Sequence, residues 1–311
     1  MTLRALVTGA NGFVGKVLCN YLDAQGWTVF RGIGLGPTEA GERYLCDLRE
    51  TDQVEGMLRW AGDLTHVFHL AAITFVPQGE ENPLEAMEVN LLGTVRLLGA
   101  LRPHAPKARF LFVSTAGVYG SPRWTPITED HPLNPEEPYA VSKAAADHYC
   151  AYLAKATGMD IVRLRPFNHS GTGQSDQFVL PSLARQIAAI EAGKAEPRLM
   201  VGNLESARDF SHVDDVVRAY ELAALRGNSG EAYNVCSGRS YSIRDVLEIL
   251  QSLAKIRFAV EVDAARVRNV DVRNIIGSHE KLSAHTDWRP QYSIEYLLRQ
   301  LLEHWRTRAV I

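Results

Sequence analysis

Three side chains in this sequence could act together as an acid–base group. Tyr139 and Lys143 stand four residues apart in PYAVSKAAADHY, a helix-like segment, so both side chains face the same side. Thr115 ends the apolar run FLFVST, where a strand would present its hydroxyl. A lysine ammonium about 4 Å from a phenol stabilises the phenolate by about 4 kcal/mol at an effective dielectric constant near 20. We therefore expect Tyr139 to exchange a proton near neutral pH with a substrate oxygen that Thr115 also binds.

A glycine-rich turn near the N-terminus predicts that this chemistry uses a dinucleotide. The run TGANGFVG places Gly9, Gly12 and Gly15 between a strand-like and a helix-like segment. Glycine has no Cβ, so the backbone can approach a pyrophosphate, and the helix N-terminus adds free N–H groups and a positive dipole. The spacing differs from the GxGxxG fingerprint, and the alternative is a turn that merely ends a strand. The strand before the turn and the helix after it favour dinucleotide binding.

The end of the second expected strand bears on which dinucleotide binds. An acid at that point receives the adenosine ribose hydroxyls of NAD, whereas an arginine accommodates the 2′-phosphate of NADP. The run VFRGIG carries Arg31, and the next acidic residue is Glu39. This favours NADP(H) over NAD(H), with a solvated arginine as the alternative. Asp47, after the third strand, is placed to accept a hydrogen bond from the adenine amino group.

The elements that must position these residues follow an alternating rhythm. Apolar, strand-like runs predict an α/β fold with a doubly wound parallel sheet covered on both faces. We expect strands at 4–9, 28–33, 43–48, 66–72, 108–115, 160–166 and 232–238, and helices at 15–26, 83–102, 139–157, 178–192 and 212–225. The rhythm breaks near Phe167. We therefore expect a Rossmann-like domain of residues 1–167 plus 211–238 and a smaller lobe of residues 168–210 plus 239–311.

Composition and charge exclude several classes of function. A net charge of −3 over 311 residues argues against a nucleic-acid partner and against a basic membrane-binding surface. No apolar run is long enough to span a membrane. The first strand begins within a few residues of the N-terminus without a signal peptide, which predicts a cytoplasmic protein. Cys19, Cys46, Cys150 and Cys236 have no ligand spacing, so we expect buried, reduced thiols and no metal site.

The glycine-rich turn, the strand-end Thr115 and the YxxxK pair together resemble the extended short-chain dehydrogenase/reductases. This is the NAD-dependent epimerase/dehydratase family, and the resemblance covers essentially the whole chain. It implies that the smaller lobe holds a nucleotide sugar, that Lys143 also binds the nicotinamide ribose, and that a homodimer forms through the helices at 83–102 and 139–157. The expected cofactor contacts are Gly9, Asn11, Gly12, Phe13, Val14, Gly15, Arg31, Asp47, Leu48, Leu70, Ala71, Ala72, Asn90, Tyr139, Lys143 and Pro166.

Motifs in the second half of the chain resemble the members of this family that act on GDP-hexoses. The runs RPFNHSGTGQ, VGNLESARDF, YNVCSG and IGSHEKL are most similar to those of the reductases. The resemblance implies a GDP-linked 4-keto-6-deoxy sugar as the partner, with its phosphates held by Asn168, Arg208 and Arg268. The alternative for the two arginines is a surface salt bridge. The expected substrate contacts are Thr115, Asn168, Val179, Asn203, Arg208 and Arg268, with Asn203 or the neighbouring backbone at the guanine edge.

The two residues after Thr115 discriminate between reactions of this family. Dehydratases carry acidic residues there, because removing water across C5–C6 of the sugar needs a further acid and base. Ala116 and Gly117 carry no proton, which argues against dehydration. We expect reduction of the C4 ketone to a GDP-6-deoxyhexose such as GDP-rhamnose; the alternative is a nucleotide-sugar 4-epimerase of the UDP-glucose/UDP-galactose type with tightly bound NAD. Asn90 is a candidate to support the proton path, or else an amide on a helix surface.

Overall fold

The computed structural model describes residues 2–34, 43–74, 80–263 and 274–309. Within these residues, seven strands form a wholly parallel sheet in the order β10-β6-β5-β4-β1-β2-β3. Its strands are β1 (Arg4–Thr8), β2 (Thr28–Ile33), β3 (Arg43–Leu45), β4 (His66–His69), β5 (Arg109–Val113), β6 (Ile161–Pro166) and β10 (Ala232–Val235). This architecture confirms the predicted α/β fold with a doubly wound parallel sheet.

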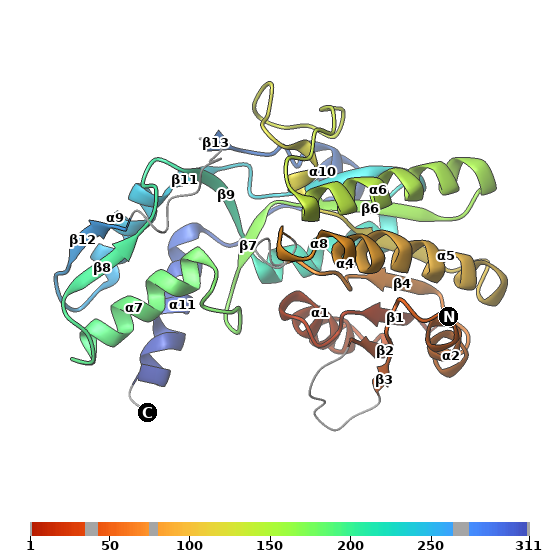
Figure 1. Ribbon diagram of the computed structural model, residues 1–311, viewed down its shortest axis with the longest axis horizontal. Helices are drawn as coiled ribbons and strands as arrows, with labels where there is room; N and C mark the ends of the chain where they lie inside the picture. Colours follow the sequence, from red (N-terminus) through yellow and green to blue (C-terminus); the bar gives the residue numbers. More distant parts are fainter. Residues whose placement is uncertain (1, 35–42, 75–79, 264–273, 310–311) are drawn as a thin grey trace.

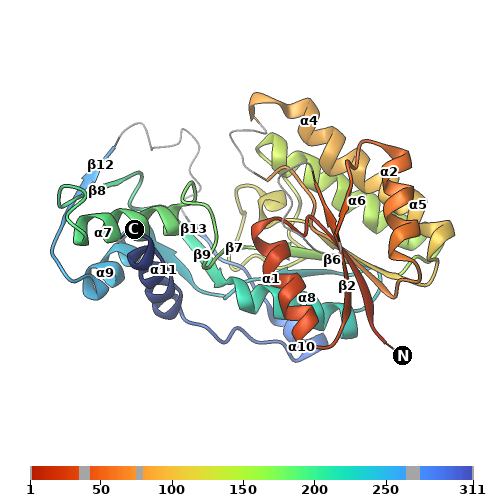
Figure 2. The ribbon, with the colours of Figure 1, turned by 90° about the horizontal axis from the view of Figure 1, so that it is seen from below.

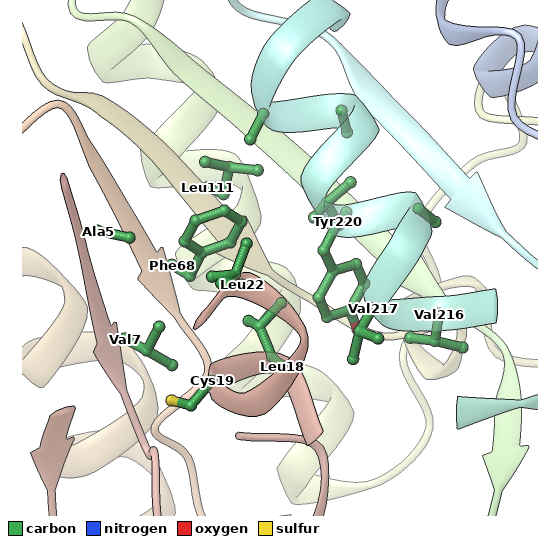
Figure 3. Close-up of a cluster of buried hydrophobic side chains, with 14 of the residues drawn as sticks. Ala5, Val7, Leu18, Cys19, Leu22, Phe68, Leu111, Val216, Val217 and Tyr220 are labelled. Atoms are coloured by element: carbon green, nitrogen blue, oxygen red, sulfur yellow. The ribbon is translucent and has the colours of Figure 1, made fainter. Parts of the chain in front are cut away.

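Helices cover both faces of this sheet, as Figure 2 shows. One face carries α1 (Phe13–Ala24), α8 (Val213–Arg226) and α10 (Glu280–Thr286), and the other carries α2 (Thr51–Ala61), α5 (Gly93–His104) and α6 (Pro138–Thr157). Successive strand residues point to opposite faces, so Leu111 packs in the first layer while Phe110 and Phe112 pack in the second. Figure 3 shows the first layer between α1, α8 and the sheet. Burial on both faces explains why the strands read as continuous apolar runs.

A smaller lobe has a hydrophobic core of its own and lies beside the large sheet in Figure 1. A second sheet contains β7 (Asn168–Ser170), β9 (Ala207–His212), β11 (Ser240–Ser242) and β13 (Asn274–Ile275). A parallel pair joins β8 (Arg198–Val201) to β12 (Ala259–Val262). The helices of this lobe are α7 (Val179–Glu191), α9 (Ile243–Leu253) and α11 (Ile294–Ala309).

Two segments differ from the sequence expectation in a way that matters for the site. The helix expected at 83–102 consists of α4 (Pro83–Met87), a π-helical turn at Glu88–Leu92 and α5. In addition, α10 packs on α8, and Leu282 and Trp288 join the core of the large sheet, although they belong to the range assigned to the smaller lobe. The proposed domain boundaries stay a prediction.

The strand order places the switch point of the sheet between β1 and β4. From β1 the chain runs outward through β2 and β3, then crosses to β4 and proceeds in the other direction. Ligands of open α/β sheets bind at such a point, outside the carboxyl ends of the strands. The glycine-rich turn and Thr115 follow the carboxyl ends of β1 and β5, so the topology brings both to the same edge.

Candidate active site

A cleft of about 1370 Å³ lies at this edge, lined by the sheet's carboxyl ends and by residues of the smaller lobe. Arg31, Asn90, Val179 and Asn203 do not line it, and Arg268 lies outside the described residues. The other predicted site residues all line the cleft: Gly9, Asn11, Gly12, Phe13, Val14, Gly15, Asp47, Leu48, Leu70, Ala71, Ala72, Thr115, Tyr139, Lys143, Pro166, Asn168 and Arg208.

The glycine-rich turn has the geometry of a phosphate cradle. Gly9 adopts a left-handed backbone (φ +72°), and a Cβ there would lie 2.8 Å from the backbone nitrogen of Ala71. A Cβ at Gly15 would lie 2.1 Å from the carbonyl oxygen of Gly9, so neither position admits a side chain. The helix α1 starts directly after Gly12, which supplies no side-chain cap. Its first-turn N–H groups therefore remain for an anion, and the turn fits the pyrophosphate of a dinucleotide.

The position of Arg31 contradicts the expectation that this residue binds the cofactor. Arg31 does not reach the cleft; its guanidinium pairs with Asp23 of α1 and donates to the carbonyl oxygen of Val29. A strand alternates its side chains, and the cleft is reached instead at the carboxyl end of β2, where Gly32, Ile33 and Gly34 offer no carboxylate for ribose hydroxyls. Among the described residues, the part of the cleft at the end of β2 therefore carries no charged side chain from this strand.

Arg49 is a cation that the sequence analysis did not single out at this end. It lines the cleft with Asp47, and its Nη2 donates to an Asp47 carboxylate oxygen at 2.7 Å. Its Nη1 lies 3.6 Å from Glu85. Hydrogen bonds from Arg49 hold the pKa of Asp47 below its ordinary value. The contact expected between Asp47 and adenine stays a prediction, since this carboxylate already accepts from Arg49.

A buried polar network supports the floor of the cleft below the turn. His69 lies between two hydroxyls, with Nδ1 2.7 Å from Thr8 Oγ1 and Nε2 2.9 Å from Thr94 Oγ1. Burial, reinforced by the charge of Lys143, lowers the pKa of His69 to about 3, so the imidazole is neutral. Thr8 Oγ1 also accepts from the backbone N–H of Ala71. The network ties the end of β1 to the loop after β4, which lines the cleft.

Thr115, Tyr139 and Lys143 meet where β5 ends and α6 begins. Thr115 caps a 3₁₀ turn, accepting from the N–H of Gly117 at 3.1 Å, and its hydroxyl hydrogen-bonds with that of Tyr139. Tyr139 is in the first turn of α6, just after Pro138, which suits the first helical position. Lys143 follows one turn later, 2% exposed, with Nζ 4.3 Å from the centroid of the Phe112 ring. The structure thus brings together the three residues predicted to do chemistry.

The protonation of this group differs from the expectation. Burial raises the pKa of Tyr139 to about 12, and the hydrogen bond from Thr115 offsets only part of that rise. Burial also lowers the pKa of Lys143 to about 8, against the opposing charges of Cys150 and Asp147. The prediction that Lys143 brings the Tyr139 pKa near neutrality in the protein alone was wrong, because burial of the phenol raises its pKa and Lys143 is not among the groups that offset that rise. Tyr139 is therefore a protonated hydroxyl, ready to donate.

The substrate side of the cleft comes from β7 and β9. Asn168 and Arg208 line it, whereas Val179 lies at the start of α7 outside it. Asn203 uses its side-chain oxygen to accept from the N–H of Glu205 in a turn. His169 lines the cleft and was missed; its Nδ1 donates to the carbonyl oxygen of Phe167 at 2.9 Å. The sequence offered a signal for His169, because in the run FNHSG it directly follows Asn168, a predicted substrate contact.

The two residues after Thr115 carry no carboxylate, but carboxylates from other parts of the chain line the cleft. Ala116 and Gly117 both line it, and a Cβ at Gly117 would meet only ordinary contacts of 3.5 Å, so glycine is not required there by packing. Glu136 and Glu137 also line the cleft, and were missed although they directly precede Pro138 and Tyr139. The Glu137 charge contributes to the raised pKa of Tyr139.

Three further observations concern groups outside this chemistry. The four cysteines are buried free thiols, as expected. Among the described residues, no cluster of three or more His, Cys, Asp or Glu side chains is arranged to hold a metal ion. Nor does that part of the chain contain a helix of sufficient length and apolarity to cross a membrane.

Comparison with known proteins places this geometry in a family. A sequence model described as GDP-mannose 4,6-dehydratase matches residues 6–301. The chain is 39% identical over 313 residues to GDP-6-deoxy-D-mannose reductase of Pseudomonas aeruginosa, covering 99% of each protein. It resembles the structure of RMD from Pseudomonas aeruginosa complexed with NADPH, with TM-score 0.89, 38% identity and coverage of 99% of this chain and 100% of that one. It also resembles the UDP-glucose 4-epimerase of Thermus thermophilus in complex with NAD, with TM-score 0.84, 31% identity and coverage of 98% and 99%.

The fold and site thus define a nucleotide-binding oxidoreductase of the Rossmann type. The chain belongs to the GDP-mannose 4,6-dehydratase family of extended short-chain dehydrogenase/reductases. Its relatives are NAD(P)-dependent nucleotide-sugar reductases, dehydratases and epimerases, so the resemblance stated from the motifs is confirmed.

Proposed function

We propose that this protein reduces the C4 ketone of a GDP-4-keto-6-deoxyhexose to a GDP-6-deoxyhexose such as GDP-rhamnose, with NADPH as the reductant. The observation that carries this reaction type is the pair Ala116 and Gly117 beside Thr115, where an acid for dehydration would stand. The GDP-6-deoxy-D-mannose reductase of Pseudomonas aeruginosa, 39% identical over 99% of the chain, supports the substrate class. The NADPH in the related RMD structure supports the cofactor.

The protonated Tyr139 performs the acid step in this proposal. A reduced nicotinamide, when bound, supplies a hydride to C4. The Tyr139 hydroxyl gives its proton to the C4 oxygen as negative charge develops there, and the Thr115 hydroxyl holds that oxygen in place. Because burial keeps Tyr139 protonated, the donor is already in the state that reduction needs. Lys143, buried in the cleft wall, places a positive charge near the phenolate that forms.

In this proposal, residues of the smaller lobe bind the nucleotide sugar. We propose that Asn168 and Arg208 contact its diphosphate, because both line the cleft on that side. Arginine offers a planar set of donors suited to phosphate. Arg268 is proposed for the same task from its sequence motif alone.

Assembly and location complete the proposal. We propose a homodimer through the outward faces of α5 and α6, where Tyr152 is 64% exposed and Leu92, at the end of the adjoining π-helical turn, is 43% exposed. The family resemblance supports this dimer, and the exposed apolar side chains on these neighbouring helices are compatible with a surface that another chain covers. We also propose a cytoplasmic enzyme without a nucleic-acid or membrane partner, in keeping with its weak net charge.

The second candidate is a nucleotide-sugar 4-epimerase. The resemblance to the Thermus thermophilus epimerase at 31% identity favours it, as does the fact that epimerisation needs no acid beside Thr115. The two functions differ in their use of the cofactor. A reductase consumes NADPH in proportion to product, whereas an epimerase keeps its NAD bound and recycles it.

A cofactor-oxidation assay tests the proposal. The purified protein is mixed with GDP-4-keto-6-deoxymannose and either NADPH or NADH, and the loss of reduced-nicotinamide absorbance is compared with product measured by chromatography. We expect one equivalent of NADPH oxidised per GDP-6-deoxyhexose formed. Absence of oxidation, together with NAD that co-purifies with the protein and interconversion of UDP-glucose and UDP-galactose, would establish the epimerase instead.

A further inference from the structure

Tyr220 carries a buried hydroxyl that the reaction outlined above does not use. It lies on α8 and is 0% exposed, and among the described residues its hydroxyl has no hydrogen-bond partner. Its ring packs in the core cluster that contains Leu18 and Leu22 of α1, as Figure 3 shows. A phenylalanine would fill the same space. The hydroxyl therefore adds nothing to this packing.

An unpaired hydroxyl at such a position is costly. Leaving a buried polar group without a partner costs about 1–3 kcal/mol. Native proteins pair nearly all such groups, so each exception calls for an explanation, such as a ligand. Serine at position 114, also buried and unpaired, can turn its hydroxyl freely, but a tyrosine hydroxyl is held at the end of a rigid ring. Tyr220 is thus the more informative of the two.

The location of Tyr220 indicates which ligand supplies the partner. Tyr220 lines the cleft, together with Phe13, Val14 and Pro166. It is also close enough to Tyr139 for the charge of one to affect the other. It thus lies at the reacting end of the cleft rather than at the end near Asp47. The N-terminus of α8 lies near the glycine-rich turn, since Val213 and Phe13 both lie against Gly171. Side chains of a helix lean toward its N-terminus, so the Tyr220 side chain leans toward the cleft.

We propose that the Tyr220 hydroxyl is a binding group for the nicotinamide half of the cofactor, donating a hydrogen bond to its carboxamide oxygen. This rests on the proposed function only in requiring that a nicotinamide dinucleotide occupies the cleft. A neutral phenol is a good donor, and the carboxamide is the hydrogen-bonding group on the nicotinamide ring. Such a bond would fix the orientation of the nicotinamide ring and so set the face that meets the sugar.

Binding of whole and truncated nucleotides tests this assignment without relying on turnover. The dissociation constants of NADP⁺ and of 2′-phospho-ADP-ribose, which lacks nicotinamide, are measured by calorimetry for the wild type and for Tyr220→Phe. The free energy of unfolding is measured for the same proteins without ligand. Tyr233→Phe is the matched control, because Tyr233 is also fully buried in this core cluster but its hydroxyl accepts from the N–H of Asn228 at 2.8 Å.

The expected result separates the two tyrosines. Tyr220→Phe should weaken NADP⁺ binding about three- to tenfold, the worth of one hydrogen bond, and leave 2′-phospho-ADP-ribose binding unchanged. It should also leave the ligand-free protein as stable as the wild type or more so. Tyr233→Phe should reduce that stability and leave both dissociation constants unchanged.

Other results overturn the assignment. Equal weakening of both ligands, or a loss of ligand-free stability in Tyr220→Phe, would show that the hydroxyl is structural or bonded to a buried water. An unchanged NADP⁺ affinity with a raised KM for the sugar nucleotide would assign it to the substrate. If the wild type binds NAD⁺ rather than NADP⁺, the comparison is made with NAD⁺ and ADP-ribose. A wild type that binds no dinucleotide would overturn both this inference and the proposed reduction, whereas dinucleotide binding without reduction would overturn only the latter.

Discussion

The side-chain amide of Asn90 donates a hydrogen bond to the hydroxyl of Ser142 at 2.9 Å, which joins the π-helical turn to the helix that carries Tyr139 and Lys143. The same amide also donates to the carbonyl oxygen of Ile73 at 3.1 Å and accepts from its N–H at 2.8 Å. Ser142 in turn donates to the carbonyl oxygen of Tyr139. Asn90 is 0% exposed, so it is not a helix-surface amide, and it holds the loop that lines the cleft against α6.

Replacing Asn90 should therefore damage both stability and the cleft. We expect Asn90→Ala to lower the free energy of unfolding by about 2–4 kcal/mol, because Ile73 and Ser142 lose three hydrogen bonds in the interior. Ser142→Ala should cost only about 1 kcal/mol, since Asn90 keeps both bonds to Ile73. Urea unfolding measures both values. A cost below about 0.5 kcal/mol for Asn90→Ala would show that this network does not support the fold.

The proposed acid step predicts a distinct signature for Tyr139. Tyr139→Phe should lower kcat for reduction by about 10²–10⁴, the range for loss of a general acid. The dissociation constant for NADPH should stay within about twofold of the wild-type value. The hydroxyl that this variant removes bonds with Thr115, so its loss need not affect cofactor binding. Thr115→Val should also lower kcat, because the oxygen that accepts the proton is then held less well. Rapid-mixing kinetics and fluorescence titration separate the two quantities, and a Tyr139→Phe variant that turns over at the wild-type rate would exclude it as the proton donor.

Lys143 makes the stability of the ligand-free protein depend on pH. Its folded-state pKa is about 8 because of burial, whereas an unfolded lysine titrates near ~10.4. The unfolded state therefore binds more protons between these values, and wild-type stability rises as pH increases through that window. Lys143→Met removes the buried charge, so it should be more stable than the wild type at pH 7, by on the order of 3 kcal/mol. Chemical unfolding at pH 7 and pH 10 should show this difference shrinking; a constant difference would contradict the titration of Lys143.

The position of Arg31 predicts that it does not select the cofactor. Its guanidinium is committed to Asp23 and Val29, and it is absent from the lining of the cleft. Arg31→Ala should change the ratio of kcat/KM for NADPH and NADH by less than about twofold, and its stability cost should be below about 1 kcal/mol, as for exposed ion pairs. Steady-state kinetics with both cofactors measure the ratio. A tenfold fall in the preference for NADPH would show that Arg31 reaches the adenosine ribose after all.

Much of this protein follows from local patterns in its sequence. Continuous apolar runs with intervening helix-like segments predicted the parallel sheet, since burial on both faces requires them. The glycines of TGANGFVG predicted the turn, because Gly9 and Gly15 lie where no Cβ fits. The spacing of Tyr139 and Lys143 placed both in the cleft because one helical turn separates them. These features depend on near neighbours in the chain, and the sequence by itself determined them.

Other features were decided only by the tertiary structure. The position of Arg31 depends on the α1 residue against which its strand packs, and the sequence does not show that Asp23 lies there. The pKa of Tyr139 is raised mainly by burial, which segments remote in the sequence produce, and the lysine four residues away does not lower it. The hydroxyl of Tyr220 is unpaired because the fold places no described polar group within hydrogen-bonding reach of it. Solvent exclusion and the satisfaction of hydrogen bonds are sums over residues remote in sequence, so they exist only once the chain has folded.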